Sequence, residues 1–489
     1  MTEVYTKKQA PNIVMIVSDQ HRADWMGCAG ASYLDTPNLD RLAEGGVRFT
    51  NAYCNAPLCV PSRMSMLSGR YPYRTEVWGN EHELATDIPT FVHALGLAGY
   101  ETVLCGRMHF KGPDQRHGYQ RRLVGDITPT YNGGQSAPYG RLKGTAAQGM
   151  LSLQLSGPGD SPVIRYDEAV TDACEQLLET RFRSGENRSL FLTVGYYGPH
   201  PTFICPPDTY ASTSAAMDGI EPISRDEEPT HPWVADWFKR LKIDNATSED
   251  VRRVRASYAG LVQQLDRHVG RVLEAARSLP GDTIVVYVSD HGEMAGDHGM
   301  FWKQSFYEGS AAVPMIWHPL SQETAEFQFA RGRMVDVPVS LLDLAPTLVG
   351  LSGAPEMPGL DGNDLRPLLL AGAVAAQDAF WTERPVFCEM LGPSRMIRYK
   401  QYKLNYYNSH ASQLFDLESD PHEKRDLFPL EAYAGVRNEL LSLLLDDWKP
   451  ERIRETVASK IADVQYLTQW GKQIGFGRMD LWPSDYSDY

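Results

Sequence analysis

Short apolar runs alternate with amphipathic stretches along most of the chain. The runs are rich in β-branched residues and are bounded by turn residues, which predicts buried strands at Asn12–Ser18, Thr102–Cys105, Ser189–Val194 and Thr283–Ser289. Between them, Thr36 and Pro37 mark the start of a helix. Apolar residues recur at helical spacing over Val251–Ala276 and Val337–Leu351. Strands that alternate with helices predict an α/β fold with a largely parallel or mixed sheet.

The pattern changes after about residue 376. Short runs separated by turn-rich links predict a small antiparallel sheet from strands at Val386–Met390, Met396–Tyr399, Tyr402–Tyr407 and Gln413–Leu417. A helix is predicted over Leu430–Trp448, and the aperiodic Gly471–Tyr489 is read either as an arm lying on a surface, such as that of a neighbouring subunit, or as a frayed terminus. We therefore expect a catalytic domain at 1–376 and a C-terminal α+β subdomain with a terminal arm at 377–489.

The composition is that of a globular protein with an excess of acid. The chain has 489 residues, of which 42% are hydrophobic and 22% charged, and its formal net charge is −15. This charge argues against nucleic acid or an anionic membrane as a partner, although a small anion responds only to the local field of a pocket. The N-terminal segment lacks an apolar signal core, and the seven cysteines include no CxxC pair. We expect a soluble, cytoplasmic protein.

Two predicted strands end in an aspartate that is followed by a second coordinating residue. Asp19 and Gln20 follow the first strand, and Asp290 and His291 follow the last strand of the α/β region. The carboxyl edge of an open α/β sheet is where ligands bind, and these oxygen and nitrogen atoms suit calcium, magnesium or manganese. The alternative is that each aspartate only caps the turn after its strand.

Basic residues follow the other strands. Arg107 and His109 come after one strand, and His200, which lies between two prolines, comes after another. Lys303 lies in the segment that follows Asp290. Each of these residues alone is more often structural than functional, but together they predict a cluster that binds an anion.

The segment CVPSRMSMLSGR at residues 59–70 is the most specific functional signal in the sequence. Pro61 suits a first helical turn, so Cys59 would lie at a helix N-terminus, whose positive end favours an anion and lowers the pKa of a thiol. Cys59 is therefore the best candidate nucleophile among the cysteines. The residues predict a site with a metal, a cysteine and basic groups, and leave the anion open.

This segment, C-x-P-S-R-x-x-x-L-x-G-R, resembles the signature of the type I sulfatases of the alkaline phosphatase superfamily, in which the cysteine is oxidised to formylglycine. The blocks NIVMIVSDQ, TPNLDRLAEGGVRFTNAY, GRMHF, GPHP, SDHGEMAGDHGMFWKQSFYE and QLFDLESDPHEKRDL are also similar to sulfatase blocks and stand in the family order. The choline-sulfatase-like branch is the nearest likeness. The resemblance implies an alkaline-phosphatase-like fold, a large mixed sheet flanked by helices with a small C-terminal antiparallel-sheet subdomain.

The resemblance also implies roles for single residues. One divalent ion, calcium first and manganese as the alternative, would be held by Asp19, Gln20, Cys59, Asp290 and His291. Formylglycine at position 59 would attack the sulfur, with Arg63 holding it and His109 assisting. His200 and Lys303 would bind the sulfate and protonate the leaving oxygen, and Asn80 and Arg107 would also bind the sulfate. Many sulfatases have Lys in place of Arg107, whose planar fork keeps the charge but puts proton donation at this position in doubt.

The implied activity is hydrolysis of an organic sulfate ester to an alcohol and inorganic sulfate. The implied partners are a small-molecule sulfate ester, a formylglycine-generating or anaerobic sulfatase-maturing enzyme, and further copies in a homo-oligomer. A choline site would need aromatic and acidic residues, and Asp126–Gly134 offers only Tyr131, so aryl, alkyl and sugar sulfates stay open. The alternatives are a phosphonate monoester or phosphodiester hydrolase of the same superfamily and a catalytically silent metal-binding homologue.

Overall fold

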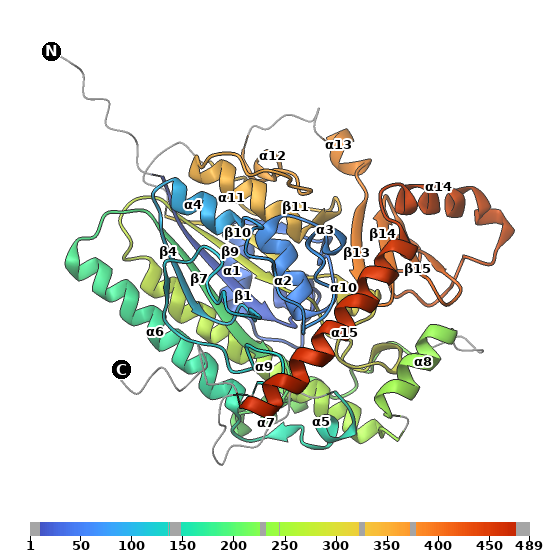
Figure 1. Cartoon of the computed structure of the whole chain (residues 1–489). Coiled ribbons are helices and arrows are strands. Elements are labelled where there is room, and N and C mark those ends of the chain that lie inside the picture. The colour runs from blue at the N-terminus through green and yellow to red at the C-terminus, as the bar shows by residue number, and fades with distance from the viewer. Residues whose placement is uncertain are drawn as a thin grey trace.

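A large sheet lies at the centre of the molecule, with helices on both of its faces (Figure 1). The computed structural model describes residues 10–475 except 135, 137–147, 225–230, 244, 322–327 and 372–377. The sheet has eight strands in the order β11-β2-β10-β9-β1-β7-β4-β5. Their bounds are β1 (Asn12–Asp19), β2 (Val47–Phe49), β4 (Glu101–Gly106), β5 (Arg121–Arg122), β7 (Leu190–Pro199), β9 (Thr283–Ser289), β10 (Met315–Ser321) and β11 (Arg333–Val335).

The centre of the sheet is parallel and one flank is antiparallel. Strand β1 pairs in parallel with β7 and β9, and β4 pairs in parallel with β7. Strand β10 runs antiparallel to both β9 and β2. The predicted mixed α/β sheet is therefore confirmed, and the four strands predicted from the α/β region form its parallel centre.

Successive residues of β1 face opposite sides of the sheet, as the strand period requires. Met15 packs in the core under α2, α4 and α11, whereas Val14 packs in the core under α1, α6 and α9. Both faces are therefore buried, which explains why the central strands are continuous apolar runs. The helices are α1 (Pro37–Gly45), α2 (Cys59–Ser68), α4 (Phe91–Leu97), α6 (Pro162–Ser184), α9 (Ser248–Ala276) and α11 (Leu344–Ser352).

The helix predicted over Val337–Leu351 begins later than expected. The first part of the predicted range instead forms β12 (Val339–Ser340), which pairs with β3 (Ala52–Tyr53). A 3₁₀ turn follows at Leu341–Asp343. The Ser340 side chain accepts a hydrogen bond from the Leu342 amide, which caps this turn. The prediction was wrong for this part because the strand forms by pairing with a segment that is distant in sequence.

The C-terminal sheet matches the prediction closely. Strands β13 (Val386–Met390), β14 (Ser394–Tyr399), β15 (Tyr402–Tyr407) and β16 (Gln413–Asp416) are antiparallel neighbours in that order. The helix predicted over Leu430–Trp448 is the shorter α14 (Ala434–Leu445).

A long helix, α15 (Pro450–Ile474), was not predicted, and it crosses one face of the molecule diagonally (Figure 1). Its only described buried residues are Pro450, Ile453, Val457 and Gly471, so it has no continuous apolar stripe. The helix includes the start of the segment predicted to be an arm, and the rest of that segment, from residue 476, lies outside the described residues.

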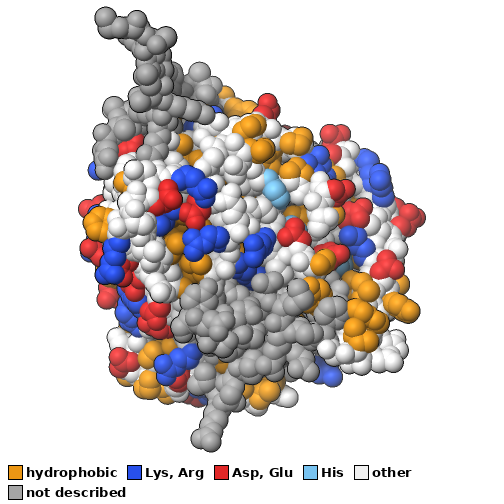
Figure 2. Space-filling view, turned by 60° about the vertical axis from the view of Figure 1, so that its left-hand side comes forward, with side chains coloured by type: hydrophobic (Ala, Val, Ile, Leu, Met, Phe, Trp, Pro, Cys, Tyr) orange, Lys and Arg blue, Asp and Glu red, His pale blue; other side chains and the backbone are white. Residues whose placement is uncertain are grey.

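The remaining elements are short connections around these layers. They are α3 (Pro72–Thr75), α5 (Met150–Gln154), α7 (Pro207–Ala216), α8 (Pro232–Leu241), α10 (Glu308–Ala311), α12 (Arg366–Leu369), α13 (Asp378–Thr382), β6 (Gly157–Pro158), β8 (Ile204–Cys205), and 3₁₀ turns at Gly27–Ala29, Asp297–Gly299 and Glu431–Tyr433. Within the described part of the chain, every helix is too short or too polar to cross a bilayer. On the face shown in Figure 2, basic and acidic side chains lie interspersed.

Candidate active site

Two aspartates meet at the carboxyl edge of the central strands. Strands β1 and β9 pair in parallel with Ser18 opposite Ser289, which brings Asp19 beside Asp290. Cys59, the first residue of α2, points at the same place. Its Sγ lies 3.2 Å from His291 Nε2 and 3.6 Å from Asp19 Oδ1. The sequence-predicted residues Asp19, Cys59, Asp290 and His291 thus form one buried group, with ligand atoms within 4.8 Å of one another.

The donor set of this group fits a divalent cation. His291 Nδ1 lies 3.0 Å from the Gly292 carbonyl, to which it donates a hydrogen bond, so the Nε2 lone pair faces the two carboxylates. The Nε2 atom lies 3.8 Å from Asp19 Oδ1 and 3.6 Å from Asp290 Oδ1. Two carboxylates and one imidazole nitrogen are ligands that calcium or manganese accepts.

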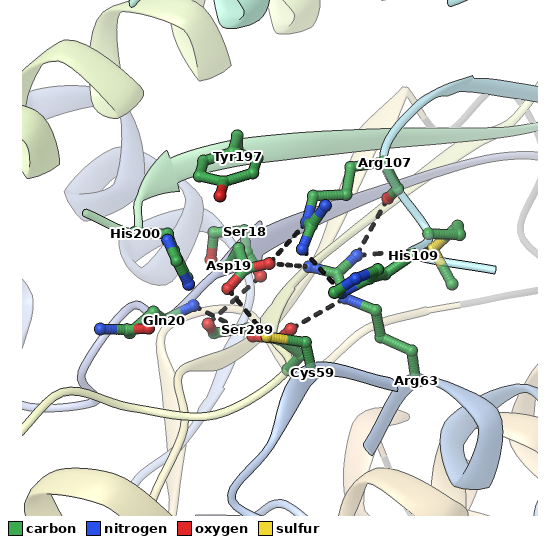
Figure 3. A network of polar contacts seen from close by, with 12 residues as sticks. Ser18, Asp19, Gln20, Cys59, Arg63, Arg107, His109, Tyr197, His200 and Ser289 are labelled. Atoms are coloured by element: carbon green, nitrogen blue, oxygen red, sulfur yellow. Dashed lines mark hydrogen bonds and ion pairs between the residues drawn. The ribbon is translucent and has the colours of Figure 1, made fainter. Parts of the chain in front are cut away.

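Arg63 joins the two aspartates from below. It lies one helical turn after Cys59 on α2, and its guanidinium donates to Asp290 Oδ2 at 2.8 Å. It also donates to Asp19 Oδ2 at 3.2 Å (Figure 3). Burial would raise the pKa of Asp19, but His200, Arg107, Arg63 and Lys303 lower it well below its usual value. Asp19 therefore stays ionised although its side chain has no contact with solvent.

Cys59 does not have the lowered thiol pKa that its place on a helix predicted. Burial, and then Asp19, raise the pKa of Cys59 to about 12. The cost of placing a thiolate in a dry site next to a carboxylate exceeds the gain from the helix N-terminus. Unmodified Cys59 is therefore a thiol and a poor nucleophile near neutral pH, which corrects the prediction.

Arg107 and His109 follow β4 and reach the other side of Asp19. Arg107 Nε donates to Asp19 Oδ2 at 2.7 Å, and its Nη2 donates to His109 Nδ1 at 2.7 Å. Because arginine can only donate, Nδ1 is the acceptor and the His109 proton is on Nε2. Burial, followed by Arg107 and Lys111, lowers the pKa of His109 well below its usual value, so the ring is neutral.

His200 and Lys303 meet beside Gln20. Lys303 Nζ lies 2.5 Å from His200 Nε2 and 2.5 Å from Gln20 Oε1. His200 Nδ1 donates to the Pro201 carbonyl at 2.7 Å, so its Nε2 accepts from the lysine. Burial and then Lys303 lower the pKa of His200 well below its usual value. This arrangement favours Lys303 as the proton donor of the pair.

Gln20 and Asn80 are engaged by partners that the sequence did not indicate. The Gln20 amide nitrogen donates to Glu293, and its oxygen accepts from Lys303. Asn80 Oδ1 accepts a hydrogen bond from the Val60 amide at 3.0 Å, so Asn80 caps the first turn of α2. The roles of Gln20 at a metal and of Asn80 at a sulfate stay predictions.

Three buried carboxylates beside the site were missed. Asp126 accepts from Arg107 Nη1 at 2.6 Å and from the His109 amide at 3.1 Å. Asp167 accepts from the Tyr197 and Gly198 amides at 2.7 and 2.8 Å, near His200. Glu293 lies in the SDHGE block, which was the only signal for it. Asp126 stands in the segment considered above only for choline, and Asp167 stands in a segment without a quoted motif, so only the fold reveals their contacts with the site.

Comparisons with known proteins identify the family of this chain. The sequence model of the Sulfatase family matches residues 11–354, and that of the N-sulphoglucosamine sulphohydrolase C-terminal domain matches residues 296–449. The chain is 32% identical to the choline-sulfatase of Rhizobium meliloti, over 85% of this chain and 82% of that protein. It is 26% identical to arylsulfatase K of Danio rerio, over 86% of this chain and 81% of that protein.

Solved structures share the fold. The phosphonate monoester hydrolase of Agrobacterium radiobacter superposes with a TM-score of 0.68 at 23% identity, covering 91% of this chain and 96% of that chain. A protein solved in complex with its substrate D-glucosamine-2-N,6-O-disulfate superposes with a TM-score of 0.69 at 21% identity, covering 92% and 99% of the two chains.

The fold is therefore that of the alkaline phosphatase superfamily, and the class is that of the sulfuric ester hydrolases. The chain belongs to the sulfatase family.

Proposed function

We propose that this protein hydrolyses an organic sulfate ester to an alcohol and inorganic sulfate, with formylglycine formed from Cys59 as the nucleophile. The observation that carries the proposal is the meeting of Cys59 with Asp19, Asp290 and His291 at one buried point, in a chain of the sulfatase family. Burial and Asp19 raise the pKa of Cys59, so in the absence of a cation the unmodified thiol would be a weak nucleophile.

Formylglycine at position 59 would supply a hydroxyl that displaces the alcohol from sulfur and would release sulfate as the aldehyde re-forms, and a divalent cation, which Asp19, Asp290 and His291 would hold with Gln20 beside them, would supply positive charge. The other steps belong to side chains of the chain. Arg63 holds both aspartates in place, and neutral His109 offers an Nε2 hydrogen-bond donor. Lys303 gives a proton to the leaving oxygen, and the sulfate would be bound by Asn80, Arg107, His200 and Lys303.

The burial of Cys59 limits when this residue can be modified. Cys59 is 1% exposed in the folded chain. A formylglycine-generating or anaerobic sulfatase-maturing enzyme could reach it only before the fold closes, so we include such an enzyme among the proposed partners, together with further copies of the chain. The proposed setting is the cytoplasm.

The test is a comparison of the native protein with two cysteine variants. We expect mass spectrometry of the Cys59 peptide from the native host to show formylglycine, and Cys59→Ala to lose sulfate release by at least ~10³-fold with an unchanged circular dichroism spectrum. Cys28→Ala is the matched control and should retain activity, since Cys28 is half-buried and is not one of the four residues that meet at the proposed metal site. Wholly unmodified Cys59 in an active enzyme, or turnover by Cys59→Ala, would contradict the proposal.

Metal binding is tested separately by thermal unfolding. Calcium or manganese added to chelator-treated protein should raise the unfolding midpoint, because a ligand that binds only the folded state stabilises it. The rise should be absent in Asp290→Asn, which removes one ligand charge. An equal rise in the variant and the wild type would place the cation elsewhere.

The second candidate is hydrolysis of phosphonate monoesters or phosphodiesters. It is favoured by the shared fold with the phosphonate monoester hydrolase and by the Asp-Gln and Asp-His pairs at positions 19–20 and 290–291. Steady-state kinetics on an aryl sulfate, a phosphodiester and a phosphonate monoester separate the two. A much higher kcat/KM on the phosphorus esters would overturn the first proposal.

A further inference from the structure

Glu293 lies at the centre of a hydrogen-bond chain behind the site. Its side chain is fully buried in the segment between His291 and Lys303. One carboxylate oxygen, Oε1, accepts from the Ala295 amide at 2.8 Å and from the Trp302 amide at 2.5 Å. These two bonds close the loop, which places Lys303 directly after a residue that Glu293 holds.

The other oxygen of Glu293 fixes the amide of Gln20. Oε2 accepts from Gln20 Nε2, and Gln20 Oε1 accepts from Lys303 Nζ. A carboxylate can only accept and an ammonium can only donate, so the amide fits between them in one orientation. The Gln20 backbone is also held, because its N–H donates to Asp290 Oδ1 at 3.0 Å and its carbonyl accepts from Tyr258 at 2.7 Å.

The chain of contacts ends on the groups expected to bind sulfate. Lys303 donates to His200 as well as to Gln20, so two acceptors fix the direction of its ammonium. If the Gln20 amide turned over, an N–H₂ group would face the lysine and repel it. The side chain of Gln20 can keep Lys303 in place only while Glu293 keeps the amide from turning.

We propose that Glu293 is a positioning residue, which sets the orientation of the Gln20 amide and through it the position of Lys303. This inference rests on the proposed function, because it assumes that Lys303 binds the sulfate and protonates the leaving oxygen. The role assigned to Glu293 is exerted through Gln20 and needs no contact with the substrate.

The first variant is Glu293→Gln, which keeps the size of the side chain. Its oxygen can still accept from the two backbone amides, but its N–H₂ group then faces Gln20 and turns that amide over. We expect kcat/KM to fall by at least ~10-fold, the effect seen when a residue that orients another site residue is lost. The loss should be larger for phenyl sulfate than for 4-nitrophenyl sulfate, because the poorer leaving group needs the proton of Lys303 more.

The second variant exchanges the two groups, as Gln20→Glu with Glu293→Gln. Gln at 293 then donates to the new carboxylate at 20, whose other oxygen accepts from Lys303, so every donor again meets an acceptor. Gln20→Glu alone places two carboxylates together. We expect the double variant to be several-fold more active than either single variant, a rescue that a merely structural role would not give.

Binding of inorganic sulfate gives a readout that does not need turnover. In the Cys59→Ala background, calorimetry should show about 10-fold weaker sulfate binding after Glu293→Gln, and recovery in the exchanged variant. The matched control is Glu101→Gln, a buried glutamate at the amino end of β4, on the opposite edge of the sheet, which pairs with Arg121 and Arg181. It should leave sulfate binding unchanged, and also the ratio of the kcat/KM values for phenyl sulfate and 4-nitrophenyl sulfate.

The inference is overturned if Glu293→Gln stays within about twofold of wild type in sulfate binding and on both esters, or if the exchanged variant is no better than the single variants. If Glu293→Gln does not fold, the exchanged variant compared with Gln20→Glu alone decides the question in the same way. A wild type that releases no sulfate from either ester would instead overturn the proposed function, so the two failures are distinguishable.

Discussion

Burial sets the protonation state of the single residues at this site. It raises the pKa of the unmodified Cys59 thiol and lowers the pKa values of His109 and His200, which favours the uncharged form of all three. The cationic side chains Arg63, Arg107 and Lys303 lie around the ionised Asp19. A buried anion placed here meets donors that are already oriented, and little reorganisation is needed when charge develops.

Asp126 contacts both Arg107 and His109, and we expect it to orient these two residues. Burial opposes its charge, but Arg107 lowers its pKa below the ordinary value, so it accepts from Arg107, Thr128 and the His109 amide. In Asp126→Asn one of these donors would face an amide N–H₂. We expect kcat/KM to fall ~10–100-fold, measured by steady-state kinetics on an aryl sulfate. Asp160→Asn, at a partly exposed ion pair with Arg165, is the control, and equal kinetics in the two variants would contradict this role.

At the scale of elements, His268 joins two helices and the sheet. Its Nδ1 lies 2.9 Å from Thr171 Oγ1, which links α9 to α6, and its ring stacks on Tyr196 of β7. Burial, then Arg271 and Arg267, lower the pKa of His268 from 6.5 to about 4. An unfolded chain therefore binds this proton below pH 6.5, whereas the folded chain does not until about pH 4.

The free energy of unfolding should consequently fall as the pH is lowered from 6.5 to 4. The contribution of His268 is about 1–3 kcal/mol, present above pH 6.5 and lost on the way to pH 4. Urea unfolding at several pH values would measure it, and His268→Gln should remove this part of the dependence. His422 is exposed, so His422→Gln should leave the pH dependence of the free energy of unfolding unchanged. A variant His268→Gln with the full wild-type slope would refute the assignment.

Helix α15 is held mainly by its first half. Ile453 and Val457 are each 6% exposed and pack in the cluster that contains Trp448, whereas Leu467 is 48% exposed. We expect Ile453→Ala to lower the free energy of unfolding by about 2–4 kcal/mol, because it leaves a cavity. Leu467→Ala should change it by less than about 0.5 kcal/mol. Urea unfolding of both variants is the measurement, and equal losses would show that the whole helix is anchored alike.

At the scale of the whole molecule, a buried cluster of paired cations and carboxylates lies inside an acidic protein. The formal net charge is −15, and on the face in Figure 2 charges of both signs are interspersed. The cations at the site are paired with buried carboxylates, so the overall charge does not describe the field that a substrate meets.

We propose that 1–376 and 377–489 form two structural units that unfold together. The boundary itself lies outside the described residues, but buried contacts join the residues before it to the residues after it. Cys388 lies 3.9 Å from Cys54 between their sulfur atoms, and Arg384 makes two hydrogen bonds to Asp343 at 2.8 and 2.6 Å. We expect a single calorimetric transition for the full chain and no folded product from 1–376 alone. Two well-separated transitions would contradict this.

Much of the fold was predictable from the sequence. The central strands, the antiparallel C-terminal sheet and α9 are encoded in local runs whose period is that of the element. Most candidate site residues were also identified from the sequence, because they stand directly after strands or in the segment at residues 59–70, whereas Asn80 came from the family resemblance. The start of α11 and the whole of α15 were not predicted. The residues before α11 form β12, which pairs with the distant β3, and α15 buries only a few residues, so neither segment shows a clear periodic pattern.

The sequence alone identified the candidates for the chemistry, and it predicted that strands bring several of them to one edge of a sheet. Only the tertiary structure decided their state: the neutral Cys59, the tautomers of His109 and His200, and the fixed amide of Gln20. The reason is that desolvation and hydrogen bonding come from partners far away in sequence, such as Asp126 for Arg107 and Glu293 for Gln20. Local pattern selects an element, but the energy of a buried charge depends on everything packed around it.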